Sequence, residues 1–144
     1  MSDLKLRPAS SLDIKVLFDL RNHPKVRKHS NNIGEISIDT HQKWFNKVIL
    51  DKSKQILIAE RGGIFIGMVR FERVDGAYLM SWAVSPEFQA QGLGKKIVGA
   101  AVNMMGKNIF TAKIKKNNFS SIKIAEYIGM ELTKETNGIL LYQK

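Results

Sequence analysis

The residues best suited to chemistry lie in the segment Gln89–Lys95, which reads Gln-Ala-Gln-Gly-Leu-Gly-Lys. Residues 77–84, just before it, alternate in a period of two and predict a largely buried strand that ends before Pro86. Residues 97–105, just after it, repeat apolar side chains at helical spacing. A loop that carries glycine and lysine therefore leads from a strand into the first turn of a helix. Free backbone N–H groups and the positive end of the helix dipole favour an anion there.

Two common phosphate-binding loops do not fit this segment. The dinucleotide pattern G-x-G-x-x-G lacks its third glycine after Gly92 and Gly94, and the acidic residue expected about 20 positions later is absent. The mononucleotide loop does not fit either, because Gln89 stands five positions before Gly94 where that loop has glycine. A strand–helix turn whose glycines serve only close packing remains the alternative.

The composition limits the class of protein and its partners. A length of 144 residues suits one domain with a sizeable core, and the formal net charge of +10 favours an anionic partner or substrate. Nucleic acid, coenzyme A and a nucleotide-activated metabolite all meet that condition. The chain has no cysteine, which excludes disulfides, thiolate metal sites and a cysteine acyl-enzyme, and is compatible with the cytosol.

Metal and membrane functions are not expected. The three histidines, His23, His29 and His41, show no paired ligand spacing, so no metal site is predicted. The first residues contain no apolar run typical of a signal peptide, and no stretch reaches the length of a membrane span. We therefore expect a cytoplasmic protein without a membrane segment.

The order of patterned segments predicts a single α/β domain over residues 1–144, with a mixed central sheet of about six to seven strands flanked by helices. The expected strands are residues 4–8, 55–60, 64–74, 77–84, 109–114, 131–134 and 139–143. Helices are expected from Ser10 or Ser11 to Arg21, after Pro24, from Ser37, over the segment after Gly94, and from Asn117 or Asn118. The helix that ends at Arg21 has an apolar face of Leu12, Ile14, Val16, Leu17, Phe18 and Leu20. The apolar face of the helix that begins at Ser37 is Trp44, Phe45, Val48 and Ile49. The apolar face of the helix after Gly94 is Ile97, Val98, Ala101, Val102, Met104 and Met105. The last helix should turn Ile122, Ala125 and Ile128 inward.

The pattern Q-x-x-G-x-G between this strand and this helix resembles the acetyl-CoA pyrophosphate loop of the GNAT superfamily of N-acetyltransferases. The order of elements resembles that fold over essentially the whole chain. Residues 118–130 are similar to the family segment N-x-x-A/S-x-x-x-Y-x-x-x-G-F/M, with matches at Asn118, Ser121, Gly129 and Met130. The family tyrosine that often protonates departing coenzyme A falls on Ala125, and a glutamate that is the base in some members falls on Lys113.

The resemblance implies acetyl-CoA as cosubstrate, no metal, and direct transfer of the acetyl group to a primary amine. It assigns the pantetheine arm to Trp82, Ala83 and Val84, with the Val84 N–H polarising the acetyl carbonyl as an oxyanion-hole donor. It assigns the pyrophosphate to Gln89, Ala90, Gln91, Gly92, Leu93, Gly94 and Lys95. Asn118 would contact the pantetheine. Ser121 is the candidate donor to the sulfur, and a small residue packed against the cofactor is its alternative.

The acceptor side is assigned by a second resemblance. Residues 21–30 and 36–45 are similar to N-acetyltransferases that act on nucleotide-linked amino sugars, and ribosomal-protein N-terminal acetyltransferases share part of this pattern. The predicted substrate-binding residues are Arg21, Arg27, His41 and Arg70. Candidates for the base are Glu72, Glu35 and His41, although a packed histidine is the alternative for His41, and a water chain would need no strong base.

We therefore predict an acetyl-CoA-dependent N-acetyltransferase whose acceptor is a small anionic amine, a nucleotide-linked amino sugar in the first place, acting as monomer or homodimer. A protein N-terminal or polyamine N-acetyltransferase is the alternative among enzymes. A catalytically silent acyl-CoA-binding module is an alternative of another class. A small nucleic-acid binder would explain the charge but lacks a helix-turn-helix, zinc-finger or RNA-binding signature.

Overall fold

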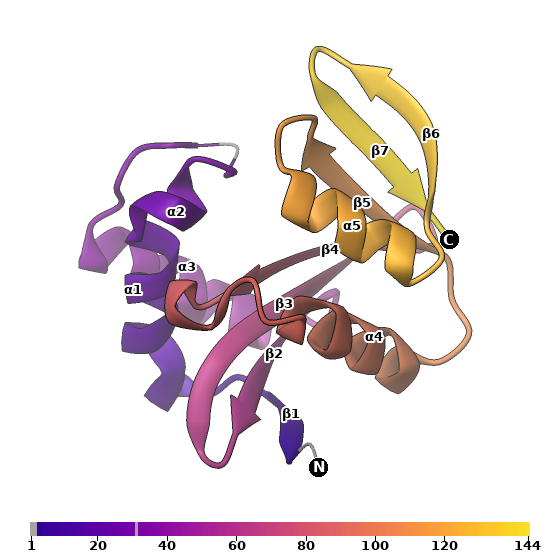
Figure 1. Cartoon of the computed structure of the whole chain (residues 1–144). Coiled ribbons are helices and arrows are strands. Elements are labelled where there is room, and N and C mark those ends of the chain that lie inside the picture. Colours follow the sequence, from indigo (N-terminus) through magenta and orange to yellow (C-terminus); the bar gives the residue numbers. More distant parts are fainter. Residues whose placement is uncertain (1–2, 31) are drawn as a thin grey trace.

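The computed structural model describes residues 3–30 and 32–144, which form one α/β domain (Figure 1). Its strands are β1 (Leu4–Pro8), β2 (Lys54–Arg61), β3 (Ile64–Val74), β4 (Ala77–Val84), β5 (Phe110–Lys115), β6 (Glu131–Thr136) and β7 (Ile139–Gln143). Its helices are α1 (Ile14–Asn22), α2 (Pro24–Arg27), α3 (Ile38–Leu50), α4 (Leu93–Met105) and α5 (Phe119–Tyr127), with 3-10 turns η1 (Ser11–Asp13) and η2 (Pro86–Phe88). The expected order of elements is confirmed.

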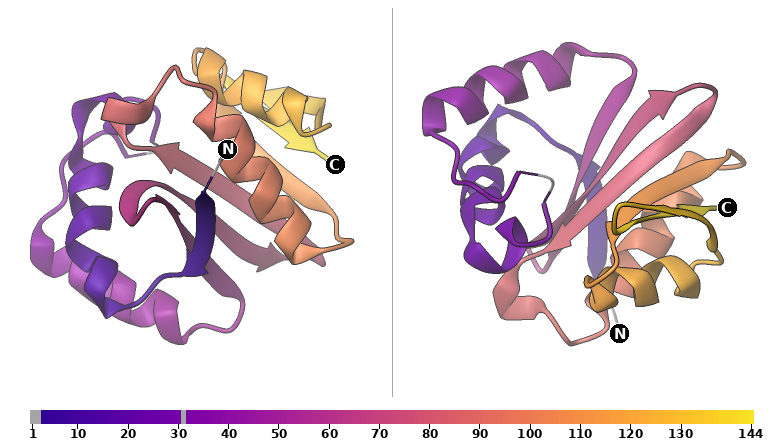
Figure 2. Two further views of the ribbon diagram at one scale, coloured as in Figure 1. Left: turned by 60° about the horizontal axis from the view of Figure 1, so that its bottom comes forward. Right: turned by 90° about the horizontal axis from the view of Figure 1, so that it is seen from above.

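The strands form one seven-stranded sheet in the order β1-β2-β3-β4-β5-β7-β6. All neighbouring pairs are antiparallel except β4 and β5, which run parallel. The N-terminal helices α1 to α3 cover one face of the sheet, and α4 and α5 cover the other (Figure 2). This is the mixed, helix-flanked sheet that the sequence predicts.

The two parallel strands separate soon after they meet. Only two residue pairs join them, Tyr78 with Phe110 and Leu79 with Thr111. Beyond these pairs β4 and β5 diverge toward their C-terminal ends (Figure 1). Their facing edges, residues 80–84 and 112–115, consequently border an opening instead of a continuous ladder. Backbone groups at these edges are left for a ligand.

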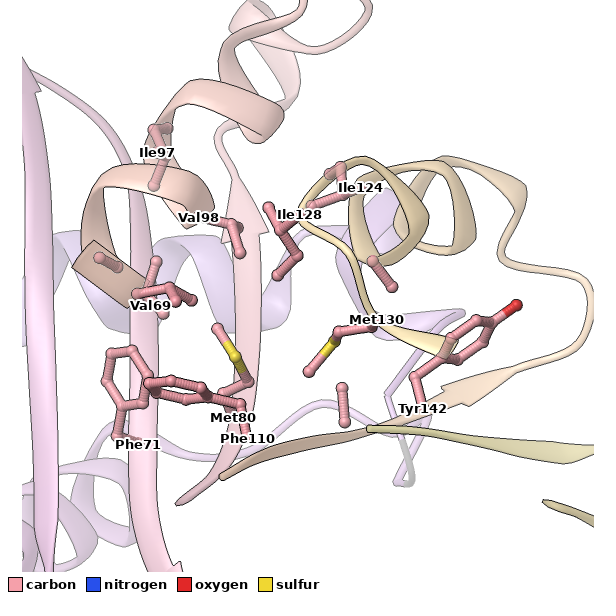
Figure 3. Packing of buried hydrophobic residues seen from close by; sticks show 14 of the residues in the cluster. Val69, Phe71, Met80, Ile97, Val98, Phe110, Ile124, Ile128, Met130 and Tyr142 are labelled. Atoms are coloured by element: carbon pink, nitrogen blue, oxygen red, sulfur yellow. The ribbon is translucent and has the colours of Figure 1, made fainter. Parts of the chain in front are cut away.

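Buried apolar residues fix the elements on either side of this opening. The larger core joins Val69 and Phe71 of β3 and Met80 of β4 to residues of α4 and α5 (Figure 3). The smaller core lies under α1 and α3 and includes Phe45 and Ile58. Because β4 contributes to the larger core while its end borders the opening, the edge residues are held on a rigid element.

Three predicted core positions are wrong. Leu12 is 91% exposed, since it lies in the 3-10 turn before α1, where the helical periodicity does not hold. Ile49 and Met104 lie at the margins of their apolar stripes and are exposed. Ile122 of α5 is half-buried and packs against the larger core, next to the buried Ile124 and Ala125 of α5 and to Ile128, which follows the helix.

Candidate active site

A cavity with a volume of about 1160 Å³ passes through the opening between β4 and β5. Its walls come from α1, α2 and α3 on one side and from the start of α4, β5 and the start of α5 on the other. The cavity thus connects the face covered by the N-terminal helices with the face covered by α4 and α5.

The predicted anion loop lies at one end of this cavity. Gln89, Ala90, Gly92, Leu93, Gly94 and Lys95 line it, and Gln91 does not. The Gln89 amide donates a 2.9 Å hydrogen bond to the Val84 carbonyl, which ties the loop to the end of β4. Ala90 and Gly92 adopt positive φ values of 63° and 75°. These left-handed residues let the chain turn sharply into α4.

The first turn of α4 has free backbone donors. Its N-cap is Gly92, which has no side chain to accept from them. Leu93, only 4% exposed, anchors the turn in the core. A Cβ atom on Gly94 would lie 2.6 Å from the Ile124 Cδ1, so the glycine also allows α4 to approach α5. The loop therefore fits a pyrophosphate group, with backbone N–H groups, the helix dipole and Lys95 on one side.

The residues predicted to contact the pantetheine arm lie at the end of β4. Trp82, Ala83 and Val84 are half-buried and line the cavity. The Ser85 N–H donates to the Ile66 carbonyl on β3 at 2.9 Å. Because successive N–H groups of a strand point to opposite edges, the Val84 N–H is directed to the edge that faces β5. It therefore faces the opening between the two strands, where the predicted oxyanion-hole donor would have to lie.

The start of α5 borders the same opening. The Asn118 side chain caps α5 by accepting a 3.2 Å hydrogen bond from the Ser121 N–H. Both residues are half-buried and line the cavity. Ala125, aligned with the family tyrosine, is fully buried in the core. Tyr127 is 64% exposed, lies outside the cavity lining, and has the Lys95 ammonium 5.2 Å from its ring centre.

Three of the four predicted substrate-binding residues line the side of the cavity next to α1, α2 and α3, which is called the acceptor end because the acceptor is predicted to bind there. Arg21 donates to the Asn32 carbonyl at 2.8 Å and so holds the loop before α3. The Arg70 guanidinium carbon lies 5.4 Å from the centre of the Trp44 ring, and its buried Nε has no hydrogen-bond partner within the described chain. Arg70 therefore has bonding capacity left for a ligand.

His41 is the third of these residues, and its surroundings favour a packing role. Its ring is 2% exposed, and Nε2 lies 3.1 Å from the Ile14 carbonyl, which fixes Nε2 as the donor. The ring packs between Phe18 and Trp44, with centroid distances of 5.5 and 5.4 Å. Burial is the main cause that lowers the His41 pKa, so the ring is neutral at pH 7.

The remaining acidic candidates and Arg27 lie apart from the cavity lining. Arg27 pairs with Glu35 at 3.2 Å. The Glu72 carboxylate lies 3.8 Å from the Lys54 ammonium. None of these three residues lines the cavity, so of the three base candidates only His41 does.

The charge of the cavity was not anticipated in full. Its acceptor end carries Arg21, Lys25, Lys28 and Arg70. Lys95 and Lys123 line the cavity from α4 and α5, and Lys113 and Lys115 line it from β5. No aspartate or glutamate is among the described lining residues. His29 also lines the cavity, and burial, followed by Lys28 and Lys115, lowers its pKa. Arg21, Lys25 and Lys28 are close together in the sequence, as are Lys113 and Lys115, but no spacing signal joins these two groups to each other or to Arg70 and Lys123.

Within the described ranges, no group of three or more histidines and carboxylates could hold a metal ion. The same residues contain no helix long and apolar enough to cross a membrane.

The opened sheet and its anion loop define a coenzyme-dependent acyltransferase of the kind expected from the sequence. The chain belongs to the GNAT acetyltransferase family, because the family model for the acetyltransferase (GNAT) domain matches residues 3–131. It is an N-acetyltransferase that uses acetyl-CoA. Comparison with curated proteins gave no match.

Solved structures share the fold at low sequence identity. Spermidine N-acetyltransferase from Vibrio cholerae, in complex with CoA and spermine, superimposes with a TM-score of 0.84 at 15% identity, covering 97% of this chain and 92% of the other. A ribosomal L7/L12 alpha-N-protein acetyltransferase in complex with coenzyme A superimposes with a TM-score of 0.84 at 18% sequence identity, covering 98% of this chain and 93% of the other. The aminoglycoside acetyltransferase AAC(6′)-Ib in complex with ribostamycin and coenzyme A superimposes with a TM-score of 0.86 at 18% sequence identity, covering 97% of this chain and 91% of the other.

Proposed function

We propose that the acceptor is a primary amine on an anionic small molecule, with a nucleotide-linked amino sugar as the best candidate. The observation that carries the proposal is the cavity lining, which combines lysines and arginines from both ends with no described aspartate or glutamate. An acceptor that brings negative charge gains from this field, whereas one that brings only positive charge is repelled.

Polycationic acceptors fit this cavity poorly. Spermine and ribostamycin, seen bound in the similar structures, carry several amino groups. Binding such molecules requires carboxylates to compensate their charge, because like charges in a partly desolvated site repel strongly. The described lining of this cavity offers no such carboxylate.

A nucleoside diphosphate is complementary in charge to the acceptor end. Lys25 and Lys28 are exposed at the cavity wall formed by α2, and Arg70 offers an unpaired Nε deeper inside. Lysine is a point charge for phosphate, and arginine offers several donors in one plane. The diphosphate would lie against these groups and direct the amino sugar toward the end of β4.

In this proposal the coenzyme and the transfer step use the residues assigned from the resemblance. The loop 89–95 and the first turn of α4 hold the pyrophosphate, residues 82–84 pair with the pantetheine arm, and the Val84 N–H polarises the acetyl carbonyl. Ser121 donates a hydrogen bond to the sulfur. No carboxylate of the described cavity lining can serve as the base, so the amine proton passes to water or to a neutral histidine.

A thiol-release assay with acetyl-CoA tests the proposal. The acceptors are UDP-glucosamine, free glucosamine, spermine, ribostamycin, and two peptides that differ only in the charge of the residues after the amino terminus. UDP-glucosamine and glucosamine form a matched pair, because they differ in the nucleotide and its charge. We expect kcat/KM to be highest for the anionic sugar and lowest for spermine. Highest turnover with spermine or the basic peptide would contradict the proposal, and release with none would indicate a silent coenzyme-binding module.

A further inference from the structure

The described lining of the cavity contains no phenol, thiol or carboxylic acid that could protonate the leaving thiolate. The position of the family tyrosine is Ala125, which is fully buried. No tyrosine, cysteine, aspartate or glutamate is among the described residues that line the cavity. The hydroxyls present belong to serine and threonine, such as Ser121, which are weak acids. Expulsion of the thiolate therefore needs another source of stabilisation.

Lys113 occupies a position suited to supply it. It lies on β5 between Ala112 and Ile114, whose side chains are buried in the core. Because strand side chains alternate, Lys113 points to the opposite face of the sheet from these two residues. It is exposed and lines the cavity where β5 has separated from β4. It forms no side-chain hydrogen bond or ion pair with any other residue that the structure describes.

The charge at this position is reversed relative to family members that place a glutamate base there. An ammonium group cannot accept a proton from the attacking amine, but it stabilises an anion nearby. Lys115 lies two residues further along the same strand face and contributes in the same direction. Lys123 on α5 and Arg70 on β3 border the same space, and His29 and His41 are neutral at pH 7 because burial lowers their pKa.

We propose that Lys113 stabilises the departing coenzyme A thiolate as an anion, so that transfer proceeds without a proton donor from the protein. The inference rests on acetyl transfer to an amine and not on the identity of the acceptor. The Lys113 ammonium acts through its charge, and a hydrogen bond from Ser121 to the sulfur is compatible with this role.

The step balances without a further reactant. The neutral amine nitrogen forms a bond to the acetyl carbon, and the carbon–sulfur bond breaks with its electron pair going to sulfur. The nitrogen loses its proton to water, which gives the amide. The sulfur leaves as thiolate and takes a proton from solvent after release. The positive charge of these lysine and arginine side chains also disfavours the ammonium form of the acceptor, so it favours the neutral amine that attacks the thioester.

The experiment is a pH titration of coenzyme A bound to the protein, followed by the ultraviolet absorbance of its thiolate. It needs no acceptor. A free thiol of this type titrates near 8.5 by analogy with cysteine. We expect the midpoint for bound coenzyme A to lie lower by about one pH unit or more, since a neighbouring cation favours the charged form. Lys113→Met should move the midpoint most of the way back, and Lys113→Arg should leave it in place.

Lys107→Met is the matched control, because Lys107 is an exposed lysine outside the cavity lining. It should not change the midpoint. A bound thiol that titrates like free coenzyme A, or a midpoint that Lys113→Met leaves unchanged, would overturn the inference. Either result would leave the proposed acceptor class intact, because that class is tested by the acceptor panel and not by this titration.

Discussion

Gly67 on β3 and Ala83 on β4 approach so closely that a Cβ atom on Gly67 would lie 2.7 Å from the Ala83 carbonyl oxygen. Gly67 pairs with Val84 in the antiparallel ladder, next to an irregularity in the pairing of β2 with β3. The missing side chain therefore sets the position of the β4 end, and with it the residues predicted to contact the pantetheine arm. A backbone contact of this kind has no flexible atom that can give way.

The first prediction concerns Gly67→Ala. The added methyl group must push β3 away from β4, so we expect the free energy of unfolding to fall by about 1–3 kcal/mol. We also expect weaker binding of acetyl-CoA, measured by calorimetry, because residues 83 and 84 shift. Gly99→Ala is the control, since a Cβ there meets nothing within 4 Å and Gly99 lies within α4. That variant should gain up to about 1 kcal/mol in stability and keep its coenzyme affinity.

The second prediction concerns the anion loop. Gly92→Val and Gly94→Val should abolish coenzyme binding in calorimetry, because a branched side chain takes the space where phosphate meets the backbone. The two substitutions are expected to act through partly different causes. Gly92 has a φ of 75°, which strains any β-branched residue, whereas a side chain on Gly94 also meets Ile124.

The double variant Gly94→Val with Ile124→Ala separates these causes. It removes the internal clash but keeps the side chain in the loop. Continued loss of binding would assign the effect to the phosphate site, and recovery would assign it to packing of α4 on α5. Unaltered affinity in both single variants would contradict the placement of the pyrophosphate.

The sequence predicts the elements well because their periodicity and capping are local. Ser37 caps α3 and Asn118 caps α5 as expected, since a side chain and the nearby backbone suffice for a cap. The extent of the cavity along a strand is not local. Met68 and Arg70 line the cavity, and Glu72 lies on the same face of β3, about 7 Å further along. The alternation of side chains along β3 shows which residues share a face of the sheet, but it does not show how far the cavity extends along the strand.

Arg27, which the sequence analysis predicts to bind substrate, lies outside the cavity lining for a related reason. Its partner Glu35 comes from the loop between α2 and α3, and nothing in the spacing of the two residues predicts that the loop returns to α2. The basic residues of the cavity come from six separate elements, and only folding brings them together.

The third prediction concerns stability against acid. Asp13 is buried, and Arg7 donates hydrogen bonds of 2.8 Å to each of its carboxylate oxygens. The hydrogen bond from Arg7 is the main cause that lowers the Asp13 pKa below its ordinary value of 3.8. A carboxylate whose pKa is lower in the folded than in the unfolded state stabilises the fold. This stabilisation is complete at pH values above the pKa of the unfolded state, and it is lost as the pH falls through the pKa of the folded state.

Asp13→Asn should therefore reduce the free energy of unfolding at pH 7 by about 1–3 kcal/mol, and its deficit should shrink as the pH falls below the ordinary carboxylate value. Denaturant unfolding at a series of pH values measures this. Asp19→Asn is the control, because Asp19 forms only an exposed pair with Lys15 on α1. A deficit that stays constant down to low pH would show that the charge of Asp13 is not its source.

The fourth prediction concerns Ser121. Ser121→Ala should lower kcat more than it weakens coenzyme binding, as expected when a group acts mainly in the transition state. The backbone N–H of residue 121 still bonds to Asn118, so the start of α5 should keep its cap. Steady-state kinetics together with calorimetry separate the two effects. Unchanged turnover would make Ser121 a packing residue beside the coenzyme.

The last prediction concerns the use of positive charge at the acceptor end. If the acceptor is an anion, its KM should rise steeply with salt, because ions screen the attraction between it and the exposed lysines. Lys28→Ala should raise the acceptor KM and spare acetyl-CoA binding, since Lys28 lines only the acceptor end and forms no ion pair in the described chain. Arg21→Ala should also raise the acceptor KM. It should in addition loosen the loop before α3, because Arg21 donates a hydrogen bond to the Asn32 carbonyl. Lys47→Ala on the outer side of α3 lies outside the cavity lining and should leave both constants unchanged. A KM that falls with salt, or a variant at Lys28 that improves the use of UDP-glucosamine, would show that the acceptor end selects against negative charge.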